Sequence, residues 1–221
     1  GWPKLDPFYN NQGDFSDQKK QLIQQYNLNS ALPVILYAPT FPAKYTSAPD
    51  LLDAIKNLNN GKYNWIIKFH SLMDISIQEK YEQLENENLR VVDEHNILPI
   101  MACADLMITD TSSVAYEFLH FDRPLITYQA IARKDKGINI QNPTELVSAI
   151  EHSLNNPKEF SANRKSCLQE IHPYVDGNSA NRVLTGIGEI LAAGLQKDLK
   201  KKPRNIIRKY QIRKIITRSQ V

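Results

Sequence analysis

The chain has 221 residues, of which 42% are hydrophobic and 23% are charged. This length and composition suit one globular domain of ordinary size, which can bury its own core without metals or disulfides. No run of apolar residues is long enough to cross a bilayer, so we expect neither a membrane-spanning helix nor a signal peptide. The first residue is Gly1 rather than Met, which indicates a fragment or a processed chain.

The cysteines and the charge distribution indicate the protein's redox state and the kind of partner it binds. Cys103 and Cys167 fall in helix-like segments and are expected to be buried thiols rather than a disulfide. No metal-ligand spacing occurs, so no metal site is predicted. Residues 197–221 hold ten Lys or Arg and one acidic residue, a net charge of +9, whereas residues 1–196 hold 17 basic and 23 acidic residues, a net charge of −6. The basic tail predicts an anionic partner such as a membrane surface, a nucleic acid or another polyanion.

Along the chain, apolar runs alternate with helix-like segments. Segment 1–9 contains two prolines and is expected to form a turn or linker. The sequence then predicts, in chain order, a helix at 16–28, a strand at 33–38, a helix at 49–59, a strand at 65–69, a helix at 76–87, a strand at 89–92, a helix at 96–104, a strand at 106–108, a helix at 113–121, a strand at 125–128, an extended piece at 137–140, and helices at 143–155, 158–171 and 178–195. The alternation predicts an α/β fold, a Rossmann-like parallel sheet with helices on both faces.

This pattern also predicts a domain organisation. Residues 1–30 form a linker and lead-in helix, residues 31–196 a Rossmann-like nucleotide-binding domain, and residues 197–221 a basic C-terminal tail. In open parallel sheets, ligands bind beyond the carboxyl ends of the strands. Thr40 follows the first predicted strand, and His70 follows the second.

The stretch Thr109–Ser113 (TDTSS), here called the polar turn, separates the fourth strand from a helix. Its hydroxyls and the unpaired N–H groups of the helix together can bind a phosphate. The alternative is that Asp110 or Ser112 only caps the helix. Neither GxxxxGK[ST] nor GxGxxG occurs, so the common nucleotide fingerprints are absent.

Two other segments also have both a structural and a functional interpretation. His70 is either a structural hydrogen-bonding residue or a group that binds a diphosphate or transfers protons. The segment Tyr174–Ala180 (YVDGNSA) is either a turn followed by a helix cap, or a second helix N-terminus that faces the same ligand.

Taken in order, five segments resemble the C-terminal half of the CDP-glycerol glycerophosphotransferases, the GT-B enzymes of teichoic-acid and capsule polymer synthesis. They are GWPKLD (1–6), LYAPT (36–40), KFHS (68–71), ADLMITDTSSVAYEFLHFDRPLITY (104–128) and YVDGNSANRV (174–183). The resemblance covers roughly residues 1–190, and the long central motif is its most specific part. It implies the C-terminal half of a GT-B fold. It also implies transfer of glycerol phosphate, or a related polyol phosphate, from CDP-glycerol to a hydroxyl of a lipid-linked or polymer acceptor.

The resemblance also implies roles for single residues. His70 would be the catalytic residue near the transferred phosphate. The implied donor-binding residues are Thr40, Asp110, Thr111, Ser112, Ser113, Asp176, Gly177 and Ser179. No cofactor is implied, and Mg²⁺ carried by the nucleotide stays open.

Three departures from the family pattern bear on activity. Thr111 stands where the family usually has Tyr, and Ser71 stands where it usually has Pro. The acceptor-side domain of the family has no counterpart in these residues. The chain is therefore expected to be the donor-binding half of a longer enzyme, or a lone donor domain that is inactive by itself.

The basic tail and a lipid-linked acceptor together predict a cytoplasmic protein that is peripheral on the inner face of the cell membrane. A solvated, disordered tail is the alternative. Nucleic-acid binding is not expected, because the body is acidic and aromatic residues do not interleave the tail's charges. Two rival functions remain: a GT-B glycosyltransferase or epimerase that uses a UDP-sugar, and a non-catalytic binding module.

Overall fold

The computed structural model describes residues 2–10, 16–195 and 205–218, with side chains up to residue 213. The chain divides into two compact units, Gly1–Gly177 and Asn178–Val221. The predicted boundary between residues 196 and 197 lies outside the described residues, so it stays a prediction.

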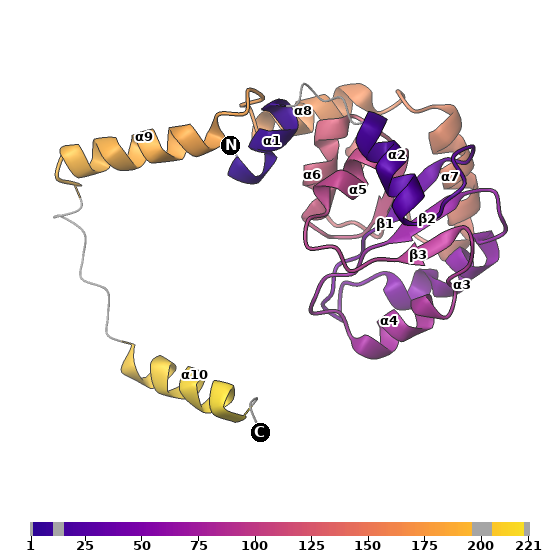
Figure 1. Ribbon diagram of the computed structural model, residues 1–221, viewed down its shortest axis with the longest axis horizontal. Coiled ribbons are helices and arrows are strands. Elements are labelled where there is room, and N and C mark those ends of the chain that lie inside the picture. Colours follow the sequence, from indigo (N-terminus) through magenta and orange to yellow (C-terminus); the bar gives the residue numbers. More distant parts are fainter. Residues whose placement is uncertain (1, 11–15, 196–204, 219–221) are drawn as a thin grey trace. The chain divides into compact units, whose positions relative to one another are not determined.

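The first unit is built on one sheet of six parallel strands in the order β3-β2-β1-β4-β5-β6. Figure 1 labels the three strands at one end of this order, β3, β2 and β1. The strands are β1 (Val34–Tyr37), β2 (Asn64–Ile67), β3 (Leu89–Val91), β4 (Leu106–Thr109), β5 (Leu125–Tyr128) and β6 (Ile138–Ile140). The predicted α/β fold is confirmed, and the extended piece predicted at 137–140 forms the sixth strand.

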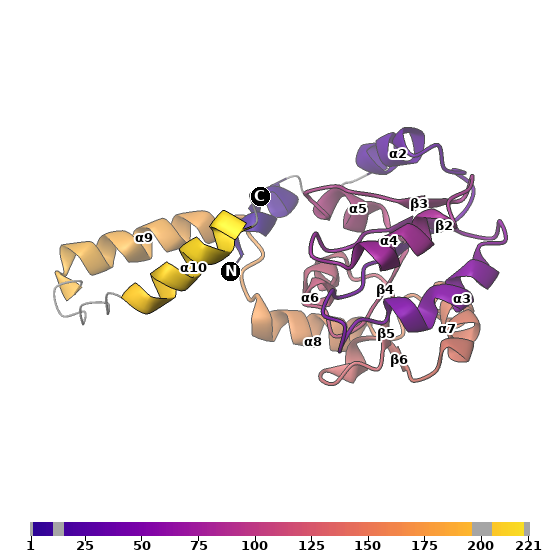
Figure 2. The ribbon, with the colours of Figure 1, turned by 90° about the horizontal axis from the view of Figure 1, so that it is seen from below.

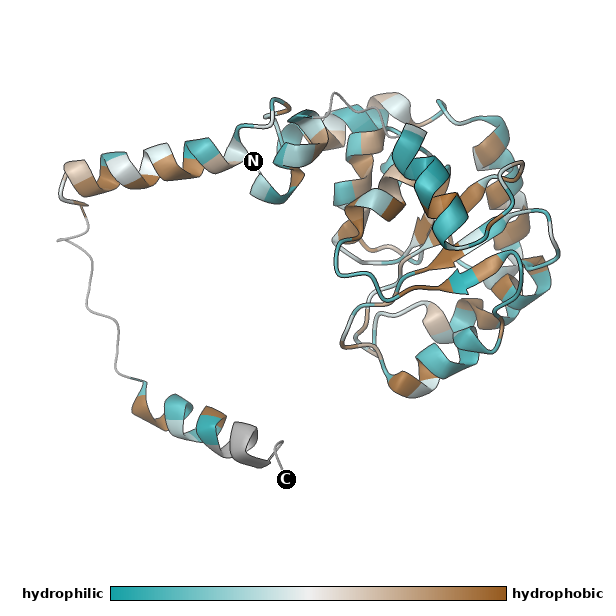
Figure 3. Ribbon diagram, viewed as in Figure 1, coloured by the Kyte–Doolittle hydropathy of each residue, from teal (hydrophilic) through white to brown (hydrophobic). Residues whose placement is uncertain are grey.

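Alternating strand residues build a core on each face of the sheet. Ile35 and Tyr37 of β1 pack into one core, and Val34 and Leu36 pack into the other. The first core is covered by α3 (Ala48–Leu58), α4 (Ile75–Glu82) and α7 (Leu146–Asn155), and the second by α2 (Ser16–Gln25), α5 (Leu98–Cys103), α6 (Val114–Phe118) and α8 (Ser161–Ile171) (Figure 2). Because the strands are apolar on both faces, they are brown in Figure 3, while the helices carry teal outer faces.

Short 3₁₀ turns complete this unit: η2 (Leu119–Phe121), η3 (Lys134–Lys136) and η4 (Pro143–Glu145). Cys103 in α5 and Cys167 in α8 are buried free thiols, as predicted.

The opening segment corrects one expectation. Residues 3–10 form a 3₁₀ turn, η1 (Pro3–Leu5), and a short helix, α1 (Asp6–Asn10), rather than a linker without helix. Pro3 is the first residue of its turn, where the missing N–H costs no hydrogen bond. Leu5 is fully buried, so tertiary packing fixes a segment that the sequence pattern alone left open.

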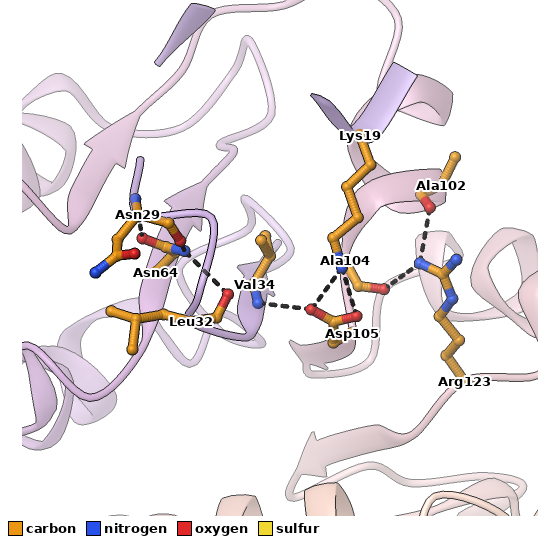
Figure 4. Close-up of polar contacts among 9 residues, drawn as sticks. All are labelled: Lys19, Asn29, Leu32, Val34, Asn64, Ala102, Ala104, Asp105 and Arg123. Carbon is orange, nitrogen blue, oxygen red and sulfur yellow. Dashed lines mark hydrogen bonds and ion pairs between the residues drawn. The ribbon is translucent and has the colours of Figure 1, made fainter. Parts of the chain in front are cut away.

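The amino ends of the strands are joined by side-chain hydrogen bonds to main-chain groups (Figure 4). The Asp105 carboxylate accepts from the Val34 N–H at 2.8 Å and from the Lys19 ammonium at 2.7 and 2.8 Å. The Asn64 amide donates to the carbonyl oxygens of Asn29 and Leu32 and accepts the Asn29 N–H. The guanidinium of Arg123 donates to the carbonyls of Ala102 and Ala104. At this edge the polar groups serve the fold.

The second unit contains α9 (Ser179–Ala192) and α10 (Ile206–Arg218). The alternative of a disordered tail is wrong for residues 206–218, which are helical, while residues 197–204 and 219–221 lie outside the described part of the chain. In the parts of the chain that the structure describes, no helix has both the length and the apolar character needed to span a bilayer.

Candidate functional site

The strand order reverses between β1 and β4, because successive connections from these two central strands run to opposite sides of the sheet. Such a switch point opens a crevice at the carboxyl ends of the strands. A cleft of about 630 Å³ lies there, lined by the loops that follow β1, β2, β3 and β4. It brings together five predicted site residues: Thr40, His70, Thr111, Ser112 and Ser113.

Asp110 is buried beneath the cleft residues and fixes the loop that contains Thr40. Its side chain is buried, with 2% of the residue exposed, and it accepts hydrogen bonds from the Thr40 N–H (2.9 Å), the Ser47 N–H (2.9 Å) and the Ser47 hydroxyl (2.8 Å). Burial raises the pKa of this carboxyl, and the hydrogen bonds from Ser47 and Thr40 oppose that rise. The carboxylate thus joins the loop after β1 to the polar turn. It does not cap the helix, and a direct contact between Asp110 and a donor stays a prediction.

The hydroxyl groups of the polar turn are placed differently. Ser112 Oγ accepts from the Val114 N–H at 3.4 Å, which is too long for a strong cap. Within the described residues, the hydroxyls of Thr111 and Ser113 have no hydrogen-bond partner, and both residues are exposed along the cleft. The helix that follows, α6, has only five residues before it tightens into η2, so its dipole adds little. An anion in the cleft would therefore meet hydroxyl and N–H donors rather than the dipole of a long helix.

His70 borders the same cleft on an exposed position after β2. Its Nδ1 accepts the Leu72 N–H at 3.1 Å, and its ring stacks on Phe41 with the ring centres 4.4 Å apart. Because Nδ1 is the acceptor, the neutral ring carries its proton on Nε2. That nitrogen has no partner among the described residues and can donate to an anion.

Charged residues that the sequence reasoning did not single out also line the cleft. Lys4 comes from η1 and Glu117 from α6, and their side chains form an ion pair at 2.5 Å. The only sequence signal for them was their presence in the motifs GWPKLD and SSVAYE, because the chain positions 4 and 117 meet only in the folded state. Lys68 and the loop residues Asp93, Glu94 and His95 complete the charged lining.

Three predicted donor-binding residues do not line this cleft: Asp176, Gly177 and Ser179. Gly177 has φ +68, and a Cβ there would lie 2.2 Å from Oδ1 of Asn10, so close packing against α1 accounts for the glycine. Asp176 is exposed, and Ser179 begins α9 in the second unit. Their roles in nucleotide binding stay predictions. Among the described residues, no group of three His, Cys, Asp or Glu side chains lies close enough to hold a metal ion.

The fold and the cleft define a class: a Rossmann-like half of a GT-B architecture with a cleft at its switch point. The family model for CDP-glycerol:poly(glycerophosphate) glycerophosphotransferases matches residues 1–189, and the chain belongs to this family. The resemblance read from the sequence motifs is therefore confirmed.

Curated relatives are teichoic acid enzymes. The teichoic acid glycerol-phosphate primase of Bacillus subtilis (strain 168) is 23% identical over 205 residues, which cover 87% of this chain and 51% of the relative. The teichoic acid ribitol-phosphate primase of Bacillus spizizenii is 24% identical, over 88% of this chain and 53% of the relative. The chain thus spans about half the length of the curated relatives it matches.

Solved structures show the same fold. The wall teichoic acid polymerase TagF, in a variant soaked with CDPG, is 20% identical with a TM-score of 0.60, covering 91% of this chain and 51% of that chain. The UDP-GlcNAc 2-epimerase from Neisseria meningitidis, bound to UDP-GlcNAc, is 12% identical with a TM-score of 0.56, covering 84% and 52%. At these identities the likeness concerns the fold alone.

Proposed function

We propose that the cleft binds the diphosphate of CDP-glycerol, and that the chain is the donor-binding half of a glycerophosphotransferase of teichoic-acid or capsule polymer synthesis. The observation that carries the proposal is the set of open hydroxyls at the switch point of a chain that belongs to this family. Thr111, Ser112 and Ser113 offer donors in the loop after β4, and Thr40 lines the cleft in the loop after β1. Donors already fixed by the fold need little reorganisation when an anion binds.

In the proposed reaction, a hydroxyl oxygen of the acceptor bonds to the β-phosphorus of CDP-glycerol. The bond from that phosphorus to the bridging oxygen breaks, so CMP leaves with the bridging oxygen and its negative charge, and the proton of the acceptor hydroxyl passes to solvent. Catalysis of phosphoryl transfer is mainly positioning and charge stabilisation. His70 would donate its Nε2–H to a phosphate oxygen, while Leu72 and Phe41 hold the imidazole in place.

The acceptor in this proposal is lipid-linked or polymeric, and the chain is peripheral on the inner face of the cell membrane. Helix α10 supports this, because its side chains carry charge and apolar groups on exposed positions. They include Arg208, Lys209, Arg213, Ile206, Ile207 and Tyr210. A basic residue near an anionic surface contributes about 1 kcal/mol of binding free energy.

Calorimetric titration of this chain with CDP-glycerol, CDP, UDP and UDP-N-acetylglucosamine tests the donor assignment. We expect the cytidine ligands to bind more tightly than the uridine ligands. We also expect His70→Ala to weaken CDP-glycerol about tenfold, the cost of one charge-assisted hydrogen bond. Tighter binding of the uridine ligands would favour a UDP-sugar enzyme instead. If none of the four ligands gives a measurable heat of binding, the proposal is contradicted.

Sedimentation with lipid vesicles tests the membrane assignment. Vesicles that contain phosphatidylglycerol should bind the chain, and vesicles of phosphatidylcholine alone should not. Deletion of residues 197–221 should abolish the binding and leave CDP affinity unchanged. Equal binding to both vesicle types would remove the electrostatic argument.

A further inference from the structure

The polar turn contains no cation. Its residues offer hydroxyl and N–H donors, and its one charged side chain is the carboxylate of Asp110, which is buried behind it. A diphosphate carries negative charge on each phosphate, and sites for such groups normally add Lys or Arg to the neutral donors. A basic group from elsewhere in the fold would therefore strengthen diphosphate binding beside the turn.

Two lysines line the cleft, and their ammonium groups have different partners. Lys68 donates to the carbonyl oxygen of its neighbour Phe69 at 2.6 Å. Lys4 instead contacts the Glu117 carboxylate at 2.5 Å. Glu117 lies one helical turn beyond Ser113, so the contact places the Lys4 ammonium along the face of the chain that begins at the polar turn. A smaller pocket of about 410 Å³ also borders Lys4, Ser113 and Glu117 together.

The backbone around Lys4 is fixed by contacts that do not involve its ammonium group. The Leu5 side chain is fully buried, and the Leu5 N–H donates to the Trp2 carbonyl at 2.9 Å. The Trp2 N–H donates to Nε2 of His172 at 3.0 Å, and its indole packs edge-on against the same imidazole. The turn therefore keeps its place when the ion pair is broken.

The ion pair itself contributes little to stability. The side chains of Lys4 and Glu117 are 50% and 21% exposed, and pairs of this kind are typically worth less than about 1 kcal/mol. A pair so weakly held exchanges partners readily when a stronger anion arrives. The arrangement combines a fixed backbone, a half-exposed charge and a nearby cluster of open hydroxyls.

We propose that Lys4 is a ligand of the donor's phosphates, and that Glu117 holds its ammonium beside the polar turn until the nucleotide binds. This inference rests on the proposed function, because it assigns a further binding residue to the same cleft. It extends the site to η1, a segment that precedes the sheet by about thirty residues.

The test is titration of the chain with CDP, CMP and cytidine. Lys4→Gln removes the charge and keeps most of the side chain, and Lys4→Arg keeps the charge. We expect Lys4→Gln to weaken CDP about tenfold, to weaken CMP less and to leave cytidine unchanged. Lys4→Arg should restore most of the CDP affinity. The matched control is Lys20→Gln, which removes an exposed lysine that pairs with Asp17 on α2 and does not line the cleft.

The outcomes separate this inference from the proposed function. If the wild-type chain binds none of the three cytidine ligands, the proposed function fails. If the wild-type chain binds CDP and Lys4→Gln binds it equally well, only the role of Lys4 fails. A loss that is the same for CDP and cytidine means that the ion pair merely holds the segment, and it also overturns the inference. Thermal unfolding of each variant shows whether η1 remains folded.

Discussion

The two edges of the sheet use polar residues in opposite ways. At the amino edge, the side chains of Asp105, Asn64 and Arg123 form hydrogen bonds with main-chain groups of nearby segments (Figure 4). At the carboxyl edge, the hydroxyls of Thr111 and Ser113 and the Nε2 of His70 have no partner among the described residues. Because these groups are exposed, water satisfies them in the free protein, and a ligand in the cleft can replace that water with hydrogen bonds of its own.

Asp110 breaks the simple form of this comparison, because it lies at the carboxyl edge and is fully engaged by the protein. Both of its carboxylate oxygens accept hydrogen bonds from Thr40 or Ser47. The Ser47 hydroxyl in turn lies 2.9 Å from the hydroxyl of Tyr37, at the end of β1. The carboxyl edge thus has two layers. In the buried layer, Asp110 and Ser47 are fully hydrogen-bonded and fix the loops. The open layer above it consists of the exposed hydroxyls of Thr111 and Ser113.

The largest effect is expected from Asp110→Ala. Removing the carboxylate leaves two N–H groups and a hydroxyl without an acceptor in a buried site. We expect the free energy of unfolding to fall by about 3 kcal/mol, measured by urea denaturation. Asp93→Ala is the control, because Asp93 is an exposed residue of the same cleft and should change stability by less than about 0.5 kcal/mol. A small stability loss for Asp110→Ala together with lost CDP binding would instead place Asp110 among the ligand contacts.

A pair of histidines beside η1 should make the stability of the fold depend on pH. Nε2 of His120 is buried without a partner among the described residues, and the ring meets His172 edge-on at 4.7 Å. Burial, with a smaller effect of His172, lowers the pKa of His120 to about 4. In the unfolded chain this imidazole takes up a proton as the pH falls through 6.5, whereas in the folded chain it stays neutral until about pH 4. The contribution of His120 to the free energy of unfolding is therefore fully present above pH 6.5 and is lost as the pH falls toward 4.

We expect this group to remove about 2 kcal/mol between pH 6.5 and 4, after allowance for its partial exposure. The groups that face the pair are Tyr9, whose hydroxyl contacts Nδ1 of His120, Asp6 and the indole of Trp2. Urea denaturation of the wild type and of His120→Gln over this pH range measures the effect. If the free energy of unfolding falls equally with pH in both proteins, carboxylates alone cause the loss of stability in acid.

Much of the sheet could be predicted because its strands are short apolar runs between turn residues, and parallel strands buried on both faces leave that pattern in sequence. Helix boundaries were less certain. The predicted helix at 76–87 ends at Glu82, because the chain then turns so that the Asn86 N–H bonds to the Leu89 carbonyl. Residues 83–87, which include Gln83, Leu84 and Glu85, continue the helical composition and give no sign of this turn.

The site could be predicted only in part, and for a physical reason. The string TDTSS identifies a polar turn, but it does not say whether a carboxylate points toward the backbone or toward a ligand. Asp110 and Ser112 are two residues apart, yet only the former is buried. Lys4 and Glu117 were missed because their contact joins positions 113 residues apart, and no local pattern encodes such a pair.

A smaller effect is expected at the amino edge from Asp105→Ala. The carboxylate is about one third exposed, so water replaces part of what is lost. We expect a decrease of about 1.5 kcal/mol in the free energy of unfolding. The affinity for CDP should stay within twofold of wild type, because the opposite edge is untouched. Asp17→Ala, which removes an exposed partner of Lys20, is the control and should leave both quantities unchanged. A clear loss of CDP affinity in Asp105→Ala would mean that the two edges are coupled.

The smallest effect on stability is expected from Ser113→Ala, and it is the sharpest test of the open layer. The Ser113 hydroxyl makes no capping hydrogen bond, so the substitution loses no contact within the protein, and the free energy of unfolding should change by less than about 0.5 kcal/mol. CDP affinity should nevertheless fall about tenfold, the cost of one charge-assisted hydrogen bond to a phosphate oxygen. Cytidine affinity should not change, because the missing contact is with phosphate. If Ser113→Ala instead lowers stability and leaves CDP affinity intact, the polar turn is only a structural turn, and the contrast between the two edges disappears.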